Sequence, residues 1–166
     1  MIEGFELVLL TIMNWAHLFA TVVWFGGMTT MFFVLIPAAK ATLEPPVMGK
    51  FMGVLAKKLK TVVYVSIIVL IVTGAVMQIL NPSDAGSGLG SRWGMVLVVK
   101  HILVALMIFV GVYIAESVVP KIVKAAAKGP SPEVGALQKK QMKLGMFNFI
   151  LCLIILLLSA YIGFLA

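Results

Sequence analysis

Four long runs of apolar residues, separated by short polar segments, dominate the pattern along the chain. They cover residues 7–39, 59–80, 93–119 and 144–166. At about 1.5 Å of rise per residue, each run can cross a hydrocarbon core of roughly 30 Å as a helix. Lipid offers the backbone no hydrogen-bond partners, so such segments must be helical. The pattern predicts an all-α integral membrane protein whose four helices form one bundle domain over residues 1–166.

Lysine placement predicts how these helices are oriented. Eleven of the twelve lysines lie in the connections after the first and third runs: Lys40, Lys50, Lys57, Lys58, Lys60, Lys121, Lys124, Lys128, Lys139, Lys140 and Lys143. The opposite side contains Glu3, Glu6, Asp84 and Arg92. Because cytoplasmic connections carry an excess of lysine and arginine, both termini are expected on the non-cytoplasmic side of the plasma membrane.

Composition excludes an ordinary soluble domain. Hydrophobic residues make up 62% of the chain and charged residues 11%, against roughly 45–50% and about 25% in soluble proteins. The net charge of +7 forms no basic stripe interleaved with aromatic residues, so the expected partner is the lipid bilayer and not nucleic acid. The first helix begins with glutamates and is too long for a signal peptide, so it is expected to remain.

The segments between the apolar runs say less about the structure than the runs do. Residues 45–58 are expected to start the second helix below the membrane or to lie along its surface. Residues 81–92 are rich in glycine, serine and proline and are expected to form a flexible loop. No internal sequence repeat is evident. A single cysteine, Cys152, excludes an intramolecular disulfide and a cysteine-based zinc site.

The two histidines, His17 and His101, both fall inside predicted spans. They lie roughly 15 Å and 12 Å along their helices from the outer ends. Ionisable residues at such depth are costly and commonly mark sites. We predict that both imidazoles coordinate one haem b iron for electron transfer, with quinone or another redox membrane protein as partner. The alternative is that each histidine only hydrogen-bonds a neighbouring helix, as in a non-catalytic accessory subunit. A homo-oligomer is compatible with either reading.

Residues near the histidines complete the predicted cofactor site. Asn14, Thr21 and Trp24 share a helical face with His17, and Asn14 or Thr21 is expected to orient the imidazole. Arg92 and Lys100 are candidates to pair with haem propionates, although each also suits a structural role as an interfacial or snorkelling cation.

Methionines support a copper alternative. Met28 and Met31 continue the face that carries His17, and thioethers bind Cu(I). Most methionines in so apolar a chain are nevertheless expected to fill space. In the fourth run, Asn148, Cys152 and Ser159 share a face and are expected to form hydrogen bonds between helices.

Several short motifs resemble a known family. The segment from His17 to Gly27, His-Leu-x-Ala-x-x-x-Trp-x-Gly-Gly, is similar to the first-helix signature of the CopD copper-resistance membrane domain. HemJ-type protoporphyrinogen oxidases share its His and Trp. Residues 35–38, the Val-Thr-Gly at 72–74, and the stretch from Trp93 to Ala105 also resemble CopD segments.

This resemblance implies a four-helix membrane bundle in which His17 binds a metal or haem. It implies copper uptake if the chain acts as CopD relatives do, or porphyrinogen oxidation on haem b if it acts as HemJ-type relatives do. The chain departs from both groups, since His101 follows Lys100 where the family has an apolar residue. It also lacks the basic, histidine-containing run of HemJ-type proteins. Whether the protein is an enzyme stays open at this point.

Overall fold

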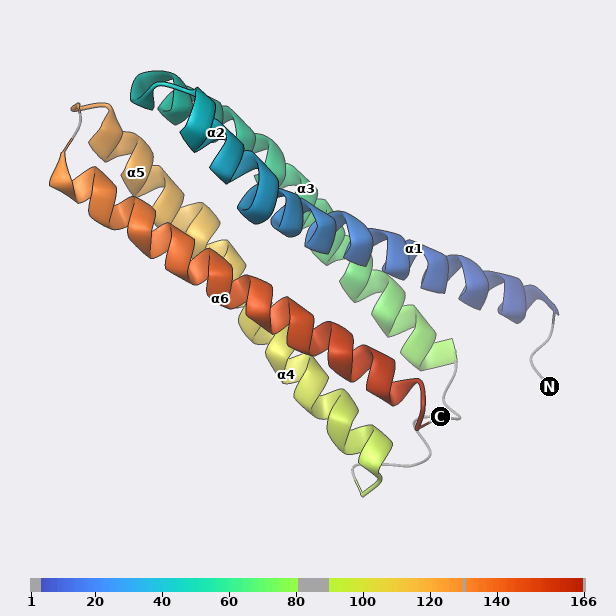
Figure 1. The fold of residues 1–166 in the computed structure, drawn as a ribbon. Coiled ribbons are helices and arrows are strands. Elements are labelled where there is room, and N and C mark those ends of the chain that lie inside the picture. The colour runs from blue at the N-terminus through green and yellow to red at the C-terminus, as the bar shows by residue number, and fades with distance from the viewer. Residues whose placement is uncertain (1–3, 81–89, 130, 166) are drawn as a thin grey trace. The chain divides into compact units, whose positions relative to one another are not determined.

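The computed structural model describes residues 4–80, 90–129 and 131–165 and confirms the all-α prediction (Figure 1). The described residues contain no strand. The elements are α1 (Gly4–Thr30), η1 (Met31–Leu35), α2 (Ile36–Thr42), α3 (Pro45–Leu80), α4 (Arg92–Tyr113), η3 (Ile114–Val118), α5 (Val119–Ala126) and α6 (Pro132–Ile162). The loop predicted over residues 81–92 falls largely outside the described residues.

Four continuous helical stretches are long and apolar enough to cross a membrane, as predicted. They cover Gly4–Thr42, Val47–Leu80, Arg92–Ala126 and Pro132–Ile162. Most of them extend well beyond the apolar runs, because the lysine-rich connections are themselves largely helical. Residues 45–58 form the start of α3, as expected. Both α3 and α6 begin at a proline, whose missing N–H costs nothing in the first turn of a helix.

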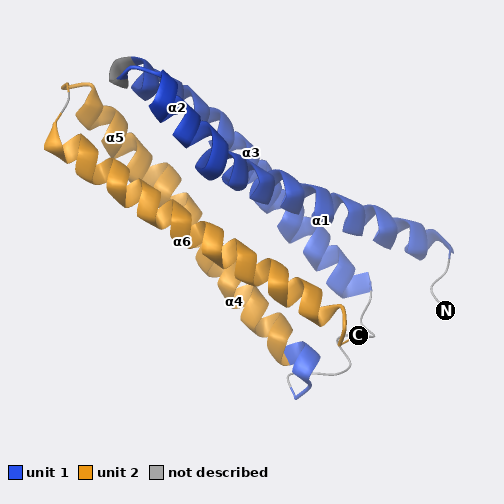
Figure 2. Cartoon of the chain, in the orientation of Figure 1, with its two compact units in different colours: residues 1–94 blue, residues 95–166 orange. Residues whose placement is uncertain are grey.

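The chain divides into two compact units, residues 1–94 and residues 95–166 (Figure 2). In the first unit, α1 packs along α3 as an antiparallel hairpin. In the second unit, α6 packs against η3 and α5. It approaches α4 near Gly111, where an added Cβ atom would lie 3.6 Å from Asn148 Nδ2. The expectation of a single domain over residues 1–166 stays a prediction.

A contact between His17 and Thr73 sets the register of the first hairpin. Because the helices are antiparallel, each step forward on α1 corresponds to a step back on α3. Trp24 therefore lies at about the level of Ser66, and each side chain is only 4% exposed. The same register places Met13 at about the level of Met77.

Two π-helical turns interrupt the long helices, one in each unit. Met31–Leu35 precedes Pro37, and Ile114–Val118 precedes Pro120. Proline lacks an N–H and its ring crowds the carbonyl four residues back. In each unit the residue before the proline bonds five residues back instead, since Ile36 N–H donates to Met31 O and Val119 N–H donates to Ile114 O. The π turns thus accommodate the prolines without breaking the helices.

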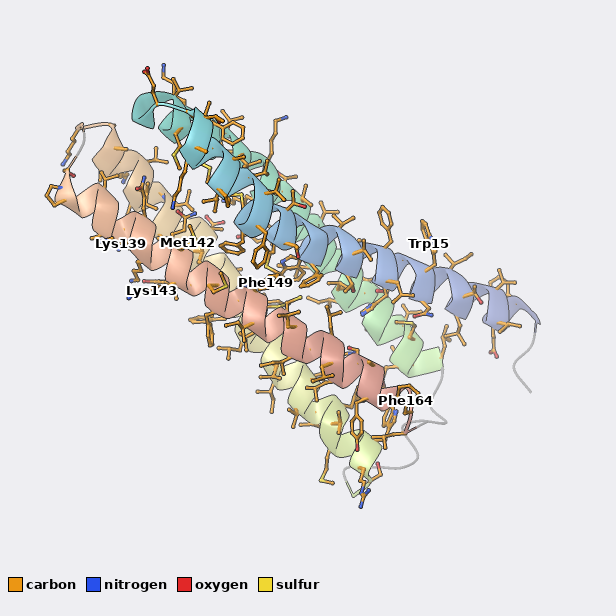
Figure 3. All side chains as sticks on the ribbon, in the orientation of Figure 1. Trp15, Lys139, Met142, Lys143, Phe149 and Phe164 are labelled. Atoms are coloured by element: carbon orange, nitrogen blue, oxygen red, sulfur yellow. The ribbon has the colours of Figure 1, made fainter. Side chains whose placement is uncertain are left out.

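Large apolar side chains cover the outer faces of the helices. Phe5, Phe109 and Leu157 are 78%, 69% and 70% exposed. Trp15 lies on the face of α1 turned away from α3 (Figure 3) and stacks on Phe19 with 5.5 Å between the ring centroids. Exposed apolar area of this extent would be unfavourable in water but matches a lipid solvent.

The helix pattern generates a topology prediction. In a Cys152→Ala background, single cysteines at Glu44 and Lys128 should resist a membrane-impermeant maleimide in intact cells, because both positions lie at lysine-rich connections. A cysteine at Gly4, at the opposite end of α1, should be labelled. Labelling of the two connection positions but not of Gly4 would show the reverse orientation.

Candidate functional site

His17 lies on α1, and its side chain forms a hydrogen bond with the side chain of Thr73 on α3. The imidazole Nδ1 is 2.8 Å from Thr73 Oγ1 on α3. Thr73 is only 4% exposed, and its hydroxyl lies 2.6 Å from the carbonyl oxygen of Val69, one turn earlier in its own helix. The histidine on one helix is thus fixed by a threonine on the other.

This arrangement favours one tautomer of His17. Thr73 has a single hydroxyl proton, and at 2.6 Å that proton must lie between its oxygen and the Val69 carbonyl. The hydroxyl is therefore the acceptor in the pair, and Nδ1–H of His17 is the donor. In a neutral imidazole this leaves the lone pair on Nε2, the nitrogen suited to bind a metal. An oriented histidine of this kind is a common feature of metal sites.

Gly74 allows the imidazole to lie close to α3. A Cβ atom added at Gly74 would be 3.6 Å from Cε1 and 3.9 Å from Nδ1 of His17. These are ordinary van der Waals contacts, so alanine would fit, but a longer side chain would press on the ring. Thr73 therefore accepts the hydrogen bond of the imidazole, and Gly74 leaves space for the ring beside α3.

Of the predicted neighbours of His17 on α1, Thr21 forms a hydrogen bond with the backbone and not with the imidazole. Thr21 donates its hydroxyl to the carbonyl oxygen of His17 itself, at 2.8 Å, and Asn14 is exposed. Thr73, which sequence reasoning had left without a role, contacts the imidazole directly. The resemblance of residues 72–74 to a family motif was the available signal. Asn14 as a cofactor ligand stays a prediction.

Soft donors line the same α1–α3 hairpin. Trp24 is buried on the face that carries His17, and Met28 and Met31 are half-buried beyond it. Met13 lies one turn before His17 on α1, and Met77 lies one turn after Thr73 on α3; both are half-buried. These two methionines were missed in the sequence because only the register of the hairpin brings them to one level.

His101 belongs to the second unit, on α4. Its Nδ1 is 2.7 Å from the carbonyl oxygen of Leu97, one turn earlier, and the side chain is exposed. A carbonyl can only accept, so Nδ1 is protonated here as well and Nε2 has the lone pair. Lys100 is half-buried and Arg92 is exposed at the start of α4. The shared site of His17 and His101 requires both units and stays a prediction.

The polar face of α6 differs from expectation at one position. Ser159 donates to the carbonyl oxygen of Ile155 in its own helix, at 2.8 Å, and not across to another helix. A serine in a helix readily bonds the carbonyl four residues back, which explains the difference. Asn148 and Cys152 are both buried.

Across the parts of the chain that the structure describes, no three His, Cys, Asp or Glu side chains gather to hold a metal ion. The donors that the described part of this hairpin does offer include the imidazole of His17 and the sulfur atoms of Met13, Met77 and Met28. That donor set suits a soft, singly charged ion better than a hard divalent one.

The tautomers are directly testable by ¹⁵N NMR of protein labelled at its two histidines. At neutral pH both imidazoles should give the Nδ1–H pattern. Thr73→Val removes the acceptor of His17 and should change only the His17 signals, whereas Thr73→Ser should preserve them. An Nε2–H pattern for His17 in the unsubstituted protein would contradict the inferred hydrogen bond.

Comparison with known proteins places the chain in a family. The model described as copper resistance protein D, CopD, matches residues 53–162. That range includes Thr73, Gly74 and His101, whereas His17 precedes it. Comparison with curated proteins and with solved structures found no match. Since the matched range is well over half of the chain, this multi-pass helical membrane protein belongs to the CopD copper-resistance family.

Proposed function

We propose that the protein carries copper across the membrane as Cu(I), with His17 as its principal ligand. The observation that supports this most is the hydrogen bond from His17 Nδ1 to Thr73 Oγ1, which leaves Nε2 with the lone pair. Membership of the CopD family supports copper as the cargo. The copper alternative therefore replaces bis-histidine haem ligation as the leading hypothesis.

The methionines extend this proposal along the hairpin. Met13 and Met77 lie about one turn from the His17–Thr73 level, on the side of the N-terminus of α1, and supply thioether donors there. Met28 lies eleven residues beyond His17, which corresponds to roughly 16 Å of helix, and Met31 lies close to one turn further. In this proposal the ion meets sulfur first, then the imidazole, and then sulfur again beyond Trp24.

The charge on the ligands suits transport more than storage. A neutral imidazole and neutral thioethers leave the single positive charge of Cu(I) uncompensated, so the ion is held less tightly than by thiolates. Transport needs sites that bind well enough to admit the ion and weakly enough to release it. With the lysine-rich connections in the cytoplasm, the membrane potential favours inward movement by about 2.3 kcal/mol per 100 mV.

One observation also favours the haem hypothesis, namely that His101 has the same Nδ1–H tautomer as His17. Two Nε2 lone pairs are what axial ligation of a haem b iron requires. Arg92 and Lys100 remain the candidates for its propionates. Purified protein should then show sharp low-spin α and β bands after reduction with dithionite, and the copper proposal expects no such bands.

The copper proposal predicts a specific role for His17. His17→Ala should strongly reduce copper accumulation by cells that express the protein, because the ion loses its only nitrogen ligand in the hairpin. His101→Ala is the matched control and should leave accumulation near the unsubstituted level. Equal loss in both variants would instead favour a site that needs both histidines.

Thr73 provides a second, graded prediction. Thr73→Val keeps the shape of the side chain but removes the hydroxyl that orients His17, and loss of such a partner typically weakens metal binding by about 10–100-fold. Thr73→Ser should restore most of the affinity. Competition between purified protein and a colorimetric Cu(I) chelator measures this, and equal affinities in the two variants would refute an orienting role for Thr73.

A further inference from the structure

A second group of buried donors lies in the other unit, on α6. Asn148 and Cys152 are 5% and 6% exposed and lie one turn apart on the same face of the helix. Side chains in a helix lean towards its N-terminus, so the Cys152 sulfur lies over the turn that carries Asn148. Neither residue has a role in the transport path proposed for the first unit.

Asn148 carries an acceptor with no donor. Among the residues that the structure describes, none donates a hydrogen bond to Asn148 Oδ1, although the atom is buried. Not even the neighbouring Cys152 thiol does so. A buried carbonyl oxygen without a partner is uncommon in folded proteins and requires an explanation such as an ion at the site.

The amide of Asn148 extends from α6 towards α4. A Cβ atom added at Gly111 on α4 would lie 3.6 Å from Asn148 Nδ2. Two residues further along α4, the hydroxyl of Tyr113 accepts a hydrogen bond of 2.8 Å from Lys140 Nζ, which lies earlier on α6. These two contacts fix α4 and α6 as antiparallel neighbours in this unit.

The antiparallel register adds a thioether to the group. One turn after Asn148 on α6 is Cys152, and one turn before Gly111 on α4 is Met107, so Met107 and Cys152 lie at about the same level. Met107 is only 4% exposed. A thiol, a thioether and an unpartnered amide oxygen, all buried, therefore lie within about one helical turn of one another along this hairpin.

We propose that Cys152, Met107 and Asn148 form a second Cu(I) site, within the α4–α6 hairpin. The proposal rests on copper being the cargo of this protein, as argued above. Cys152 sulfur and Met107 sulfur are the soft ligands that Cu(I) prefers. The amide of Asn148 directs its carbonyl oxygen, the negative end of the amide dipole, at the ion. The ion is then the partner that Oδ1 lacks.

Charge balance selects the oxidation state. On binding, the Cys152 S–H bond breaks, a Cu–S bond forms, and one proton is released to solvent, with no change in the oxidation state of copper. The thiolate and Cu(I) together are neutral, which suits an apolar surrounding. Cu(II) would leave a net positive charge and would lack the harder ligands that it favours. The site is thus expected to hold copper more tightly than the neutral donors around His17.

X-ray absorption at the copper edge tests this site without relying on transport. The probe is Cu(I) added anaerobically, one equivalent per chain, to purified His17→Ala protein. The spectrum should show a shell of two sulfur atoms. Replacing Cys152 with alanine in that background should lower the affinity for Cu(I) by about tenfold or more and remove one sulfur.

Matched variants separate the site from general disturbance of the fold. Met107→Leu and Asn148→Leu preserve side-chain volume and should each weaken Cu(I) binding, whereas Ser159→Ala, on the same face of α6, should not. Unchanged affinity and sulfur number in the Cys152 variant would overturn the proposal. The two proposals can also fail separately. If His17→Ala leaves copper accumulation unchanged but the sulfur shell is still observed, the α4–α6 site stands and the transport role of His17 is rejected.

Discussion

Polar groups inside a lipid-embedded helix must find their partners within the protein, and this constraint shapes the whole structure. Several hydroxyl groups meet it locally. Thr11, Thr29 and Thr42 each donate to the carbonyl oxygen four residues earlier in the same helix. Such local bonds satisfy the hydroxyl but do not link one helix to another. The contact from His17 to Thr73 is different because it joins two helices. It both secures the hairpin and sets the chemistry of the imidazole.

The same constraint explains how much could be predicted from the sequence. Long apolar runs predicted the number and type of the spanning helices, because length and apolarity alone decide whether a segment can cross a bilayer. The ends of the helices were predicted less well, since lysine-rich segments such as residues 132–143 continue the helix without being apolar. Resemblance to the CopD family, noted from short motifs, is confirmed by the family match.

The residues of the proposed site differ in how visible they are in the sequence. His17 stood out because a histidine in an apolar run is conspicuous. Thr73 did not, because a threonine in a membrane helix commonly bonds its own backbone, as Thr21 does. Which threonine also meets a histidine depends on the register between two helices, and register is not visible in a single helical pattern. Register also decides that Met13 and Met77, and likewise Met107 and Cys152, lie at about the same level.

The paired prolines and π turns have a consequence for how the two hairpins compare. The first helical stretch, residues 4–42, has its π turn just before Pro37, and the third, residues 92–126, has its π turn just before Pro120. These two stretches can therefore be aligned on their prolines without a gap. His17 and Lys100 then fall at equivalent positions, each twenty residues before its proline. One hairpin therefore has an imidazole at this position and the other an amino group, which cannot bind a cation while it is protonated. The two hairpins, each with a π turn before a proline, thus carry different chemistry twenty residues before that landmark.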